Sequence, residues 1–435
     1  MMGAVTTHAT PEPDSVQEDG AFDRPDPETA PEPDSATSLP PAGTPPPAGA
    51  DDEALRTWRP SRRLIVLLTI LVVVVATLVA AATVPINMVI EAPGPTWNVL
   101  GSADTDGSQD SNGQSSVINV TGARTYPADG ALRMTTVSVR GCPGSPVTAL
   151  DVIQAWFDDN KTIVDRNTVC PESMSAQEVE QVNQAQMTSS QDAAVVAALM
   201  ETGLATRMVL QVENLAEEQT STEIQIGDIL TSITPEGGPT TQVTDFGQLR
   251  ALLTTIPPGT RVTLGVERDG AAVETHLTTI NPKDADGDGN PDSEGSLLGL
   301  VLSARADSDI DATFGLQDVG GPSAGSMFAL GIVDALTPGD MTGGKDIAGT
   351  GTIEIDGQVG AIGGIRQKMA GAQDAGSDYF LAPASNCSEV VGHEPRGMEV
   401  FAVSTLHEAV GAVEAIAAGD TSGLTTCEAV AAPSS

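Results

Sequence analysis

One serine stands among small residues in the stretch DVGGPSAGSMFAL, positions 318–330. The apolar run that follows Ser323 and ends at Leu336 predicts a helix that begins at the serine. Such a helix presents unpaired N–H groups and the positive end of its dipole, which would stabilise an oxyanion. Two interpretations compete: a tight turn into a core helix, or a loop open to a substrate backbone. The second interpretation assigns substrate and oxyanion contacts to Gly320, Gly321, Pro322 and Ala324.

A serine hydroxyl is a weak nucleophile at neutral pH and needs a base within hydrogen-bond distance. The chain has 4 histidines, and none of them stands in a sequence context that favours a catalytic role. A Ser-His-Asp triad nevertheless stays open, because triads assemble from distant positions. Lysines are equally scarce, and they are Lys161, Lys283, Lys345 and Lys368.

Lys368 lies in GGIRQKMAGAQDAG, a predicted helix with Gly376 as its C-terminal cap. Helical spacing places Lys368 on one apolar face with Ile365, Met369 and Ala372. Burial disfavours the charged form of a lysine and lowers its pKa toward that of a useful base. The alternative is a lysine whose ammonium group reaches past the edge of the apolar face into water. The opposite, polar face of this helix carries Arg366, Gln367, Gln373 and Asp374.

The order GGPSAG, then GTGTIEIDGQVGAIGGIRQK, resembles the proteolytic domain of Lon proteases, which use a Ser-Lys dyad. By this resemblance Ser323 is the nucleophile, Lys368 is the base, and Thr350 orients the amine. Lon enzymes carry an aspartate three residues before the serine, where this chain has Gly320, and Asp318 is the nearest acid. The resemblance covers residues 295–420 and is closest to membrane-anchored, PDZ-containing Lon-like proteases. It implies that residues 86–200 complete the protease fold and that the chain can form a homo-oligomeric ring.

The middle of the chain, residues 204–281, resembles a PDZ domain. The resemblance rests on IGDILTSI, on a predicted helix at 246–256 and on PPGTRVTLGVERDG. In PDZ domains a peptide adds as a strand between a sheet edge and a helix. The glycine-rich loop that precedes this edge in PDZ domains is only weakly matched here, by ETGLATR. By the resemblance, the peptide-binding edge comprises Met208, Val209, Leu210, Gln211 and Val212.

Residues 64–84 contain no charged side chain and are numerous enough to span a bilayer. Four arginines precede this stretch, and acidic residues follow it before the next basic one. The positive-inside rule therefore predicts a cytoplasmic N-terminus and an extracytoplasmic remainder. A cleaved signal peptide is the alternative, because VAAAT offers small residues for cleavage. The acidic, Pro-rich residues 1–60 predict a disordered tail, and the pattern suits a bacterial plasma membrane.

The formal net charge of −39 argues against nucleic-acid binding, because phosphates would be repelled. Outside the cytoplasm disulfides persist, and sequence proximity favours Cys142 with Cys170 and Cys387 with Cys427 among the three pairings. No close Cys/His cluster suggests zinc, and we expect no cofactor. The linker DADGDGNPDSEG resembles a calcium loop without its final glutamate, so it is either a weak calcium site or a solvated linker. Its candidate ligands are Asp284, Asp286, Asp288 and Asp292.

The segment GDMTGGKD approaches a phosphate-binding loop, but Asp346 stands where Ser or Thr would bind Mg²⁺. We therefore expect an ATP-independent serine endopeptidase that takes peptides or exposed protein segments as substrates, with the PDZ-like part recognising substrate or gating the site. The rival interpretations are an inactive PDZ scaffold, a dyad esterase or amidase, and a calcium-dependent envelope protein.

The fold class we expect is α+β, a Lon-type protease domain with an inserted, mostly β PDZ-like domain. The expected divisions are the tail (1–60), the transmembrane helix (64–84), the first protease part (86–200), the PDZ-like domain (204–281), the Asp/Gly-rich linker (282–294), the second protease part with the dyad (295–420) and a C-terminal tail (421–435).

Overall fold

The computed structural model describes residues 61–101, 116–142, 145–170, 175–282, 294–316 and 319–432. The expected tail, the calcium-loop aspartates Asp284–Asp292 and the acid Asp318 lie outside these residues. Helix α1 (Arg62–Thr83) has 22 residues and a mean hydropathy of 3.2 in its most apolar window. It is therefore long and apolar enough to cross a membrane, a property that signal sequences share.

A six-stranded mixed sheet carries the serine–lysine part of the chain. Its order is β18-β17-β14-β4-β2-β6; the first four strands are parallel, and β2 runs antiparallel to both neighbours. The sheet joins strands from both sides of the PDZ-like segment. The strand bounds are β2 (Met88–Asn98), β4 (Ala131–Arg140), β6 (Thr162–Asp165), β14 (Asp346–Gly349), β17 (Tyr379–Pro383) and β18 (Glu399–Val403).

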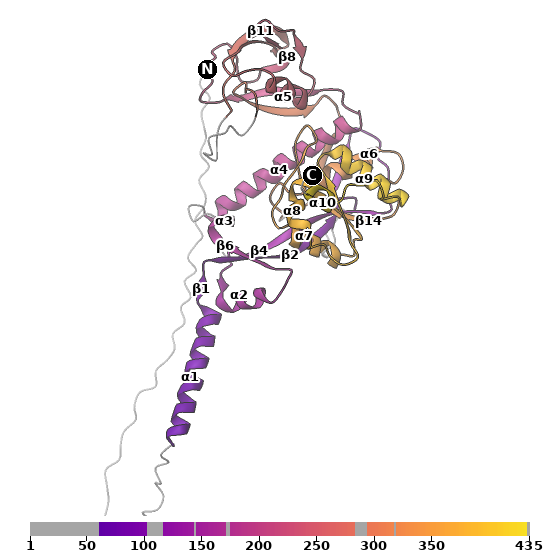
Figure 1. Ribbon diagram of the computed structural model, residues 1–435. Coiled ribbons are helices and arrows are strands. Elements are labelled where there is room, and N and C mark those ends of the chain that lie inside the picture. Colours follow the sequence, from indigo (N-terminus) through magenta and orange to yellow (C-terminus); the bar gives the residue numbers. More distant parts are fainter. Residues whose placement is uncertain are drawn as a thin grey trace, which may run out of the picture. The chain divides into compact units, whose positions relative to one another are not determined.

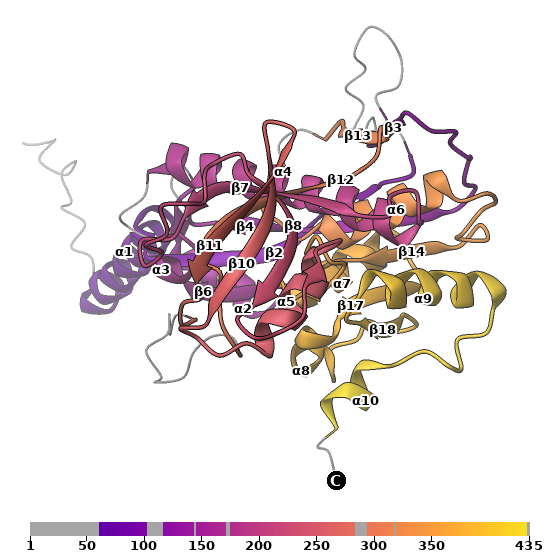
Figure 2. The ribbon, with the colours of Figure 1, turned by 90° about the horizontal axis from the view of Figure 1, so that it is seen from above.

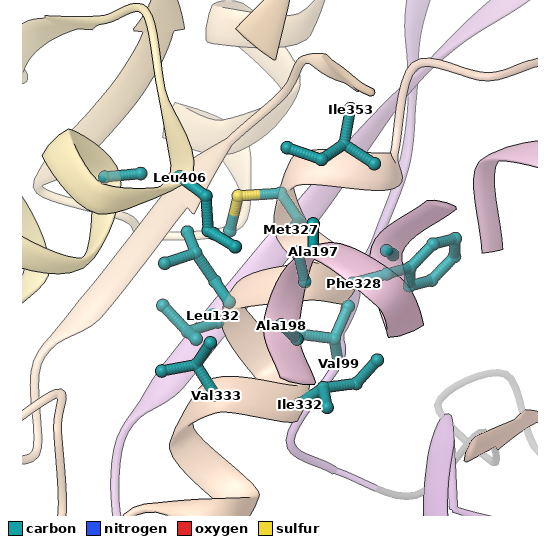
Figure 3. Close-up of a cluster of buried hydrophobic side chains, with 14 of the residues drawn as sticks. Val99, Leu132, Ala197, Ala198, Met327, Phe328, Ile332, Val333, Ile353 and Leu406 are labelled. Carbon is teal, nitrogen blue, oxygen red and sulfur yellow. The ribbon is translucent and has the colours of Figure 1, made fainter. Parts of the chain in front are cut away.

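Alternate side chains of these strands enter two different cores, as the period of two in a strand requires. In β14, for example, Ile347 packs in one core and Ala348 in the other. One core lies under α4 (Ala176–Glu201), α6 (Gly325–Leu336) and α9 (Leu406–Ala418), and Figure 3 shows Met327 and Phe328 of α6 within it. The other core lies under α7 (Ile365–Asp374), α8 (Cys387–Val390) and α10 (Cys427–Ala431).

A second sheet has the order β11-β10-β8-β7-β12, with the short β9 beside β8 (Figure 2). Its helix α5 (Phe246–Thr254) buries Leu249 and Leu253 in the same core as the sheet. The strand bounds are β7 (Met208–Leu215), β8 (Ile229–Pro235), β9 (Thr241–Gln242), β10 (Arg261–Arg268), β11 (Ala271–Thr278) and β12 (Leu300–Ala306). Strand β12 falls within 295–420, the expected second protease part, but it pairs with β7 in this second sheet, so the boundary expected at 295 is wrong.

Short elements complete the described structure (Figure 1). The cysteines pair as Cys142–Cys170 and Cys387–Cys427, the combination that sequence proximity favours. The remaining bounds are β1 (Pro85–Ile86), β3 (Ile118–Thr121), β5 (Val147–Thr148), α2 (Ala149–Trp156), α3 (Arg166–Val169), β13 (Asp311–Phe314), β15 (Thr352–Ile353), β16 (Val359–Gly360) and the 3-10 turn η1 (Ala384–Asn386).

Candidate active site

Ser323 and Lys368 meet at the carboxyl end of the parallel strands, although 45 positions separate them in the chain. The lysine Nζ lies 2.7 Å from the serine Oγ, which is within hydrogen-bond distance. Ser323 stands just before α6, and Lys368 lies in the first turns of α7, which packs against β2 and β4 (Figure 1). A hydroxyl and an amine at this distance have the spacing that a nucleophile and its base require.

Lys368 is 3 % exposed, and it shares the buried face of α7 with Ile365, Met369 and Ala372 as the helical spacing predicts. Its burial lowers the pKa of the amine from 10.5 to about 7. No carboxylate hydrogen-bonds or pairs with Nζ among the described residues. The lowered pKa makes the neutral form of Lys368, which can accept a proton, accessible near neutral pH.

The polar face of this helix is not exposed throughout. Gln367, which the spacing places on that face, is buried, and its Nε2 donates a hydrogen bond of 2.7 Å to Thr162 Oγ1 on β6. The first turn of α7 is thus covered by β6 in addition to β2 and β4, the strands on which the helix packs. The sequence cannot show this, because β6 comes from a segment about 200 positions earlier.

Thr350 connects the lysine to the backbone of the serine. Lys368 Nζ donates to Thr350 Oγ1 at 2.9 Å, and the threonine hydroxyl donates to the Ser323 carbonyl oxygen, also at 2.9 Å. Thr350 is 1 % exposed and directly follows β14. Because its hydroxyl proton is committed to the carbonyl, its oxygen can only accept from the amine. This arrangement directs the lone pair of the neutral amine away from Thr350 and toward Ser323.

The serine loop is held by helix α4, which the sequence analysis did not connect with the site. The Gly321 N–H donates to the Asn183 carbonyl at 2.9 Å, and Ser190 Oγ donates to the Pro322 carbonyl at 2.9 Å. Gly321 has a φ of 86°, a conformation that glycine adopts without strain. A Cβ at Gly320 would approach Asn183 Cβ to 2.8 Å. The small residues thus let the loop lie directly on α4.

Two backbone N–H groups at the start of α6 are unpaired. Within the described residues, the N–H groups of Ser323 and Ala324 have no hydrogen-bond acceptor, whereas the Gly325 and Ser326 N–H groups donate to the Pro322 and Gly351 carbonyls. Helix α6 has no side-chain cap. Unpaired donors at the positive end of a helix can stabilise a developing oxyanion next to Ser323 Oγ.

A cavity of about 360 Å³ opens beside the dyad. Its walls combine apolar side chains with hydroxyl groups, and they come from β2, β4, α4, the serine loop and the start of α7, so the cavity has room for an uncharged side chain next to Ser323. It is lined by Pro95, Trp97, Met134, Thr135, Thr136, Val137, Ser138, Met187, Val319, Gly320, Ser323, Ala324, Gly363 and Lys368.

None of the described histidines hydrogen-bonds to Ser323. The ring of His276 contacts Glu223, and the ring of His407 contacts Glu201. The described ranges also contain no group of three or more His, Cys, Asp or Glu side chains that could hold a metal ion. Of the bases considered from the sequence, Lys368 is therefore the one that reaches the serine in this structure.

The predicted peptide-binding edge Met208–Val212 is not an edge. This segment lies in β7, which pairs with β12 on one side and with β8 on the other. Its backbone is therefore already occupied, and the outer strands of the sheet are β11 and β12. The prediction failed because β12 follows the Asp/Gly-rich linker, and no local pattern indicates that the chain returns to this sheet after the linker.

Comparison with known proteins identifies the part of the chain that carries this geometry. Residues 306–414 match the family model of the Lon protease (S16) C-terminal proteolytic domain. Ser323, Thr350 and Lys368 all lie within the matched segment. The match covers about a quarter of the chain and includes neither α1 nor β7–β11.

Curated relatives support the same similarity. Lon protease 1 of Sorangium cellulosum is 37 % identical over 109 residues, which cover 24 % of this chain and 13 % of that protein. The archaeal Lon protease of Methanocaldococcus jannaschii is 35 % identical over 92 residues, covering 21 % of this chain and 14 % of the relative. This chain thus corresponds to a small share of the length of these relatives.

Proposed function

We propose that this chain is a membrane-anchored, ATP-independent serine endopeptidase that cleaves peptide bonds with the dyad Ser323 and Lys368. The observation that carries the proposal is the 2.7 Å contact between Nζ and Oγ, made by a buried lysine inside a segment similar to Lon proteolytic domains. A lysine buried without a carboxylate costs stability, and a catalytic role explains why it is retained.

In the proposed reaction, the neutral Lys368 amine accepts the Ser323 hydroxyl proton as Oγ attacks the carbonyl carbon of a peptide bond. The carbonyl oxygen becomes an oxyanion, which accepts hydrogen bonds from the Ser323 and Ala324 N–H groups. Collapse of this intermediate breaks the C–N bond, and the Lys368 ammonium protonates the departing amine. A water molecule, deprotonated by the same lysine, then hydrolyses the ester and restores the serine.

Independence from ATP is supported by the surroundings of GDMTGGKD. A phosphate-binding loop leads into a helix, but this segment leads into strand β14. Asp346 at its end pairs with Arg133 at 2.7 Å and accepts from Ser377 Oγ at 2.6 Å. The segment therefore connects α6 to β14, and Arg133 and Ser377 hold the Asp346 carboxylate at the position where a phosphate-binding loop has its Ser or Thr.

We propose that α1 anchors the chain in a bacterial plasma membrane, with the N-terminus in the cytoplasm and the catalytic part outside it. The arginines before the helix and the two disulfides both support this orientation. Substrates would then be exported unfolded peptides or exposed segments of membrane proteins.

We propose that the PDZ-like sheet receives a peptide at β12 instead of β7. The turn before β12 lies at the end of α5, where the Ser296 N–H donates to the Leu253 carbonyl and Leu298 packs with Leu249 and Leu253. The Leu298 and Gly299 N–H groups have no acceptor among the described residues, and such groups can bind a terminal carboxylate. Strand β12 leads through β13 to the serine loop. A peptide bound at β12 would therefore either be delivered to Ser323 or control access to it.

The proposal is tested with the full chain in detergent micelles, incubated with casein, with fragments identified by mass spectrometry. We expect wild type to cleave casein, and we expect Ser323→Ala and Lys368→Ala to abolish cleavage. The matched controls are Ser326→Ala, whose buried hydroxyl has no hydrogen-bond partner in the described structure, and Lys345→Ala, in the surface turn before β14. Both should still cleave. Cleavage that survives Lys368→Ala would refute the dyad.

A further inference from the structure

Helix α2 presents apolar side chains that nothing in the described structure covers. Trp156 is 80 % exposed and Phe157 is 84 % exposed, the largest values among the large apolar side chains of the described residues. Leu150 and Ile153 are exposed on the same side, at the spacing of one helical face. The inner side of the helix is occupied, because Ala155 and Val152 pack against β2 and β5. The exposed side is thus a second apolar face.

The start of α2 is tied to the end of the candidate membrane span. Strand β1 begins two residues after α1 ends at Thr83, and it pairs with β5, with Pro85 opposite Thr148. Thr148 is itself the N-cap of α2. Paired strands lie about 5 Å apart, and an eight-residue helix is about 12 Å long. Every residue of α2 is therefore close to the point where the chain would leave a bilayer.

Of the three acidic residues in and just after this helix, Asp151 and Asp158 have partners, whereas the exposed Asp159 has no ion-pair partner among the described residues and must stay in the hydrated headgroup layer. Asp151 accepts hydrogen bonds from the Thr148 N–H and hydroxyl, which complete a capping box at the helix start. Asp158 pairs with Lys161 at 2.9 Å. Tryptophan and phenylalanine prefer the interface between headgroups and acyl chains, where a short amphipathic helix can lie in the plane of the membrane.

We infer that α2 rests in the outer lipid interface, with Leu150, Ile153, Trp156 and Phe157 inserted among headgroups and upper acyl chains. This inference rests on the proposed membrane anchorage by α1. It adds a second contact beside the transmembrane helix, which limits how the catalytic part can rotate or tilt above the bilayer. The site would then face substrates at a restricted height, which favours segments close to the membrane surface.

The test uses the full chain reconstituted in phosphatidylcholine vesicles, some made with lipid brominated on the upper acyl chain, which quenches nearby tryptophan. One variant carries Trp58→Phe and Trp97→Phe, so that Trp156 alone emits. The matched control carries Trp58→Phe and Trp156→Phe, so that Trp97, in the cavity beside the dyad, alone emits. Flotation of the vesicles through a density gradient reports anchorage independently.

We expect both variants to float with the vesicles, and we expect brominated lipid to quench Trp156 strongly but not Trp97. Flotation with unquenched, water-like emission from Trp156 would overturn the inference and leave the anchorage intact. Flotation with emission that is shielded from water but unquenched, and that depends on protein concentration, would overturn it in favour of a second copy of the chain. Failure to float would refute the anchorage itself. Ile153→Ser in the Trp156 variant should weaken the quenching.

Discussion

Replacing Lys368 by methionine should inactivate the protein and at the same time stabilise it. The lysine is 3 % exposed, and its pKa is lowered from 10.5 to about 7 by burial. A shift of this size corresponds to about 5 kcal/mol of free energy, because each unit is worth about 1.4 kcal/mol. At pH 7 the folded state bears about 4 kcal/mol of this cost. Methionine has a similar length and no charge, so it removes the cost.

The gain is reduced by the hydrogen bonds of Nζ to Thr350 and Ser323, each worth about 1 kcal/mol. We therefore expect Lys368→Met to raise the free energy of unfolding by about 2 kcal/mol at pH 7. The unfolded state binds more protons than the folded state between pH 7 and 10.5, so wild type gains stability as the pH rises through this range. The advantage of the variant should fall by about 2 kcal/mol between pH 7 and pH 9.

The assay is urea unfolding of both proteins in detergent micelles at pH 7, 8 and 9, followed by tryptophan fluorescence. Lys345→Met serves as the control for the same substitution at a lysine that is only partly buried. A stability difference that does not change with pH would refute the reasoning. So would any loss of stability at pH 7, because the burial cost that methionine removes exceeds the value of the two hydrogen bonds.

Further expectations concern the rate, the threonine, a buried acid and the disulfides. The kcat/KM for peptide cleavage should rise about tenfold per pH unit below pH 7 and level off above it, since the neutral Lys368 is the base; a profile flat from pH 5 to 9 would contradict this. Thr350→Val should lower kcat more than it raises KM, because it misdirects Nζ, whereas Thr350→Ser should restore most of the rate; equal rates for both variants would exclude the orienting role. Burial raises the pKa of Asp334 to about 6, so Asp334→Asn should cost less stability at pH 7 than at pH 4, as measured by urea unfolding. Reducing Cys387–Cys427, whose sequence separation is 40, should cost about 4 kcal/mol through the freed loop, seen as a lower urea midpoint.

Much of the site could be predicted because the residues that form it follow local sequence patterns. The apolar run after Ser323 predicts α6, and the spacing around Lys368 predicts the buried face of α7. Because the chain has only four lysines and four histidines, few residues could act as the base for Ser323. Proximity in the sequence also favoured the disulfide pairs that the structure contains. Each of these inferences needs only neighbouring residues or composition.

The errors come from contacts between distant segments. The helical spacing places Gln367 on the polar face of α7, but it does not reveal that β6 covers this residue and supplies Thr162 as its partner. Met208–Val212 has the pattern of a strand, yet nothing local reveals that β12 will pair with it about 90 positions later. The sequence also does not show that Asn183 and Ser190 support the serine loop. The residue pattern of a helix such as α4 does not indicate which loop will pack against it.

The most direct test of the dyad is covalent labelling by a fluorophosphonate, which reacts with activated serines. The full chain is labelled between pH 5 and pH 9, and the modified residue is identified by mass spectrometry. The account predicts one label, on Ser323, with a labelling rate that rises with a midpoint near pH 7 and is lost in Lys368→Met. Labelling of Ser323 that is unaffected by Lys368→Met, or labelling of another serine in its place, would contradict it.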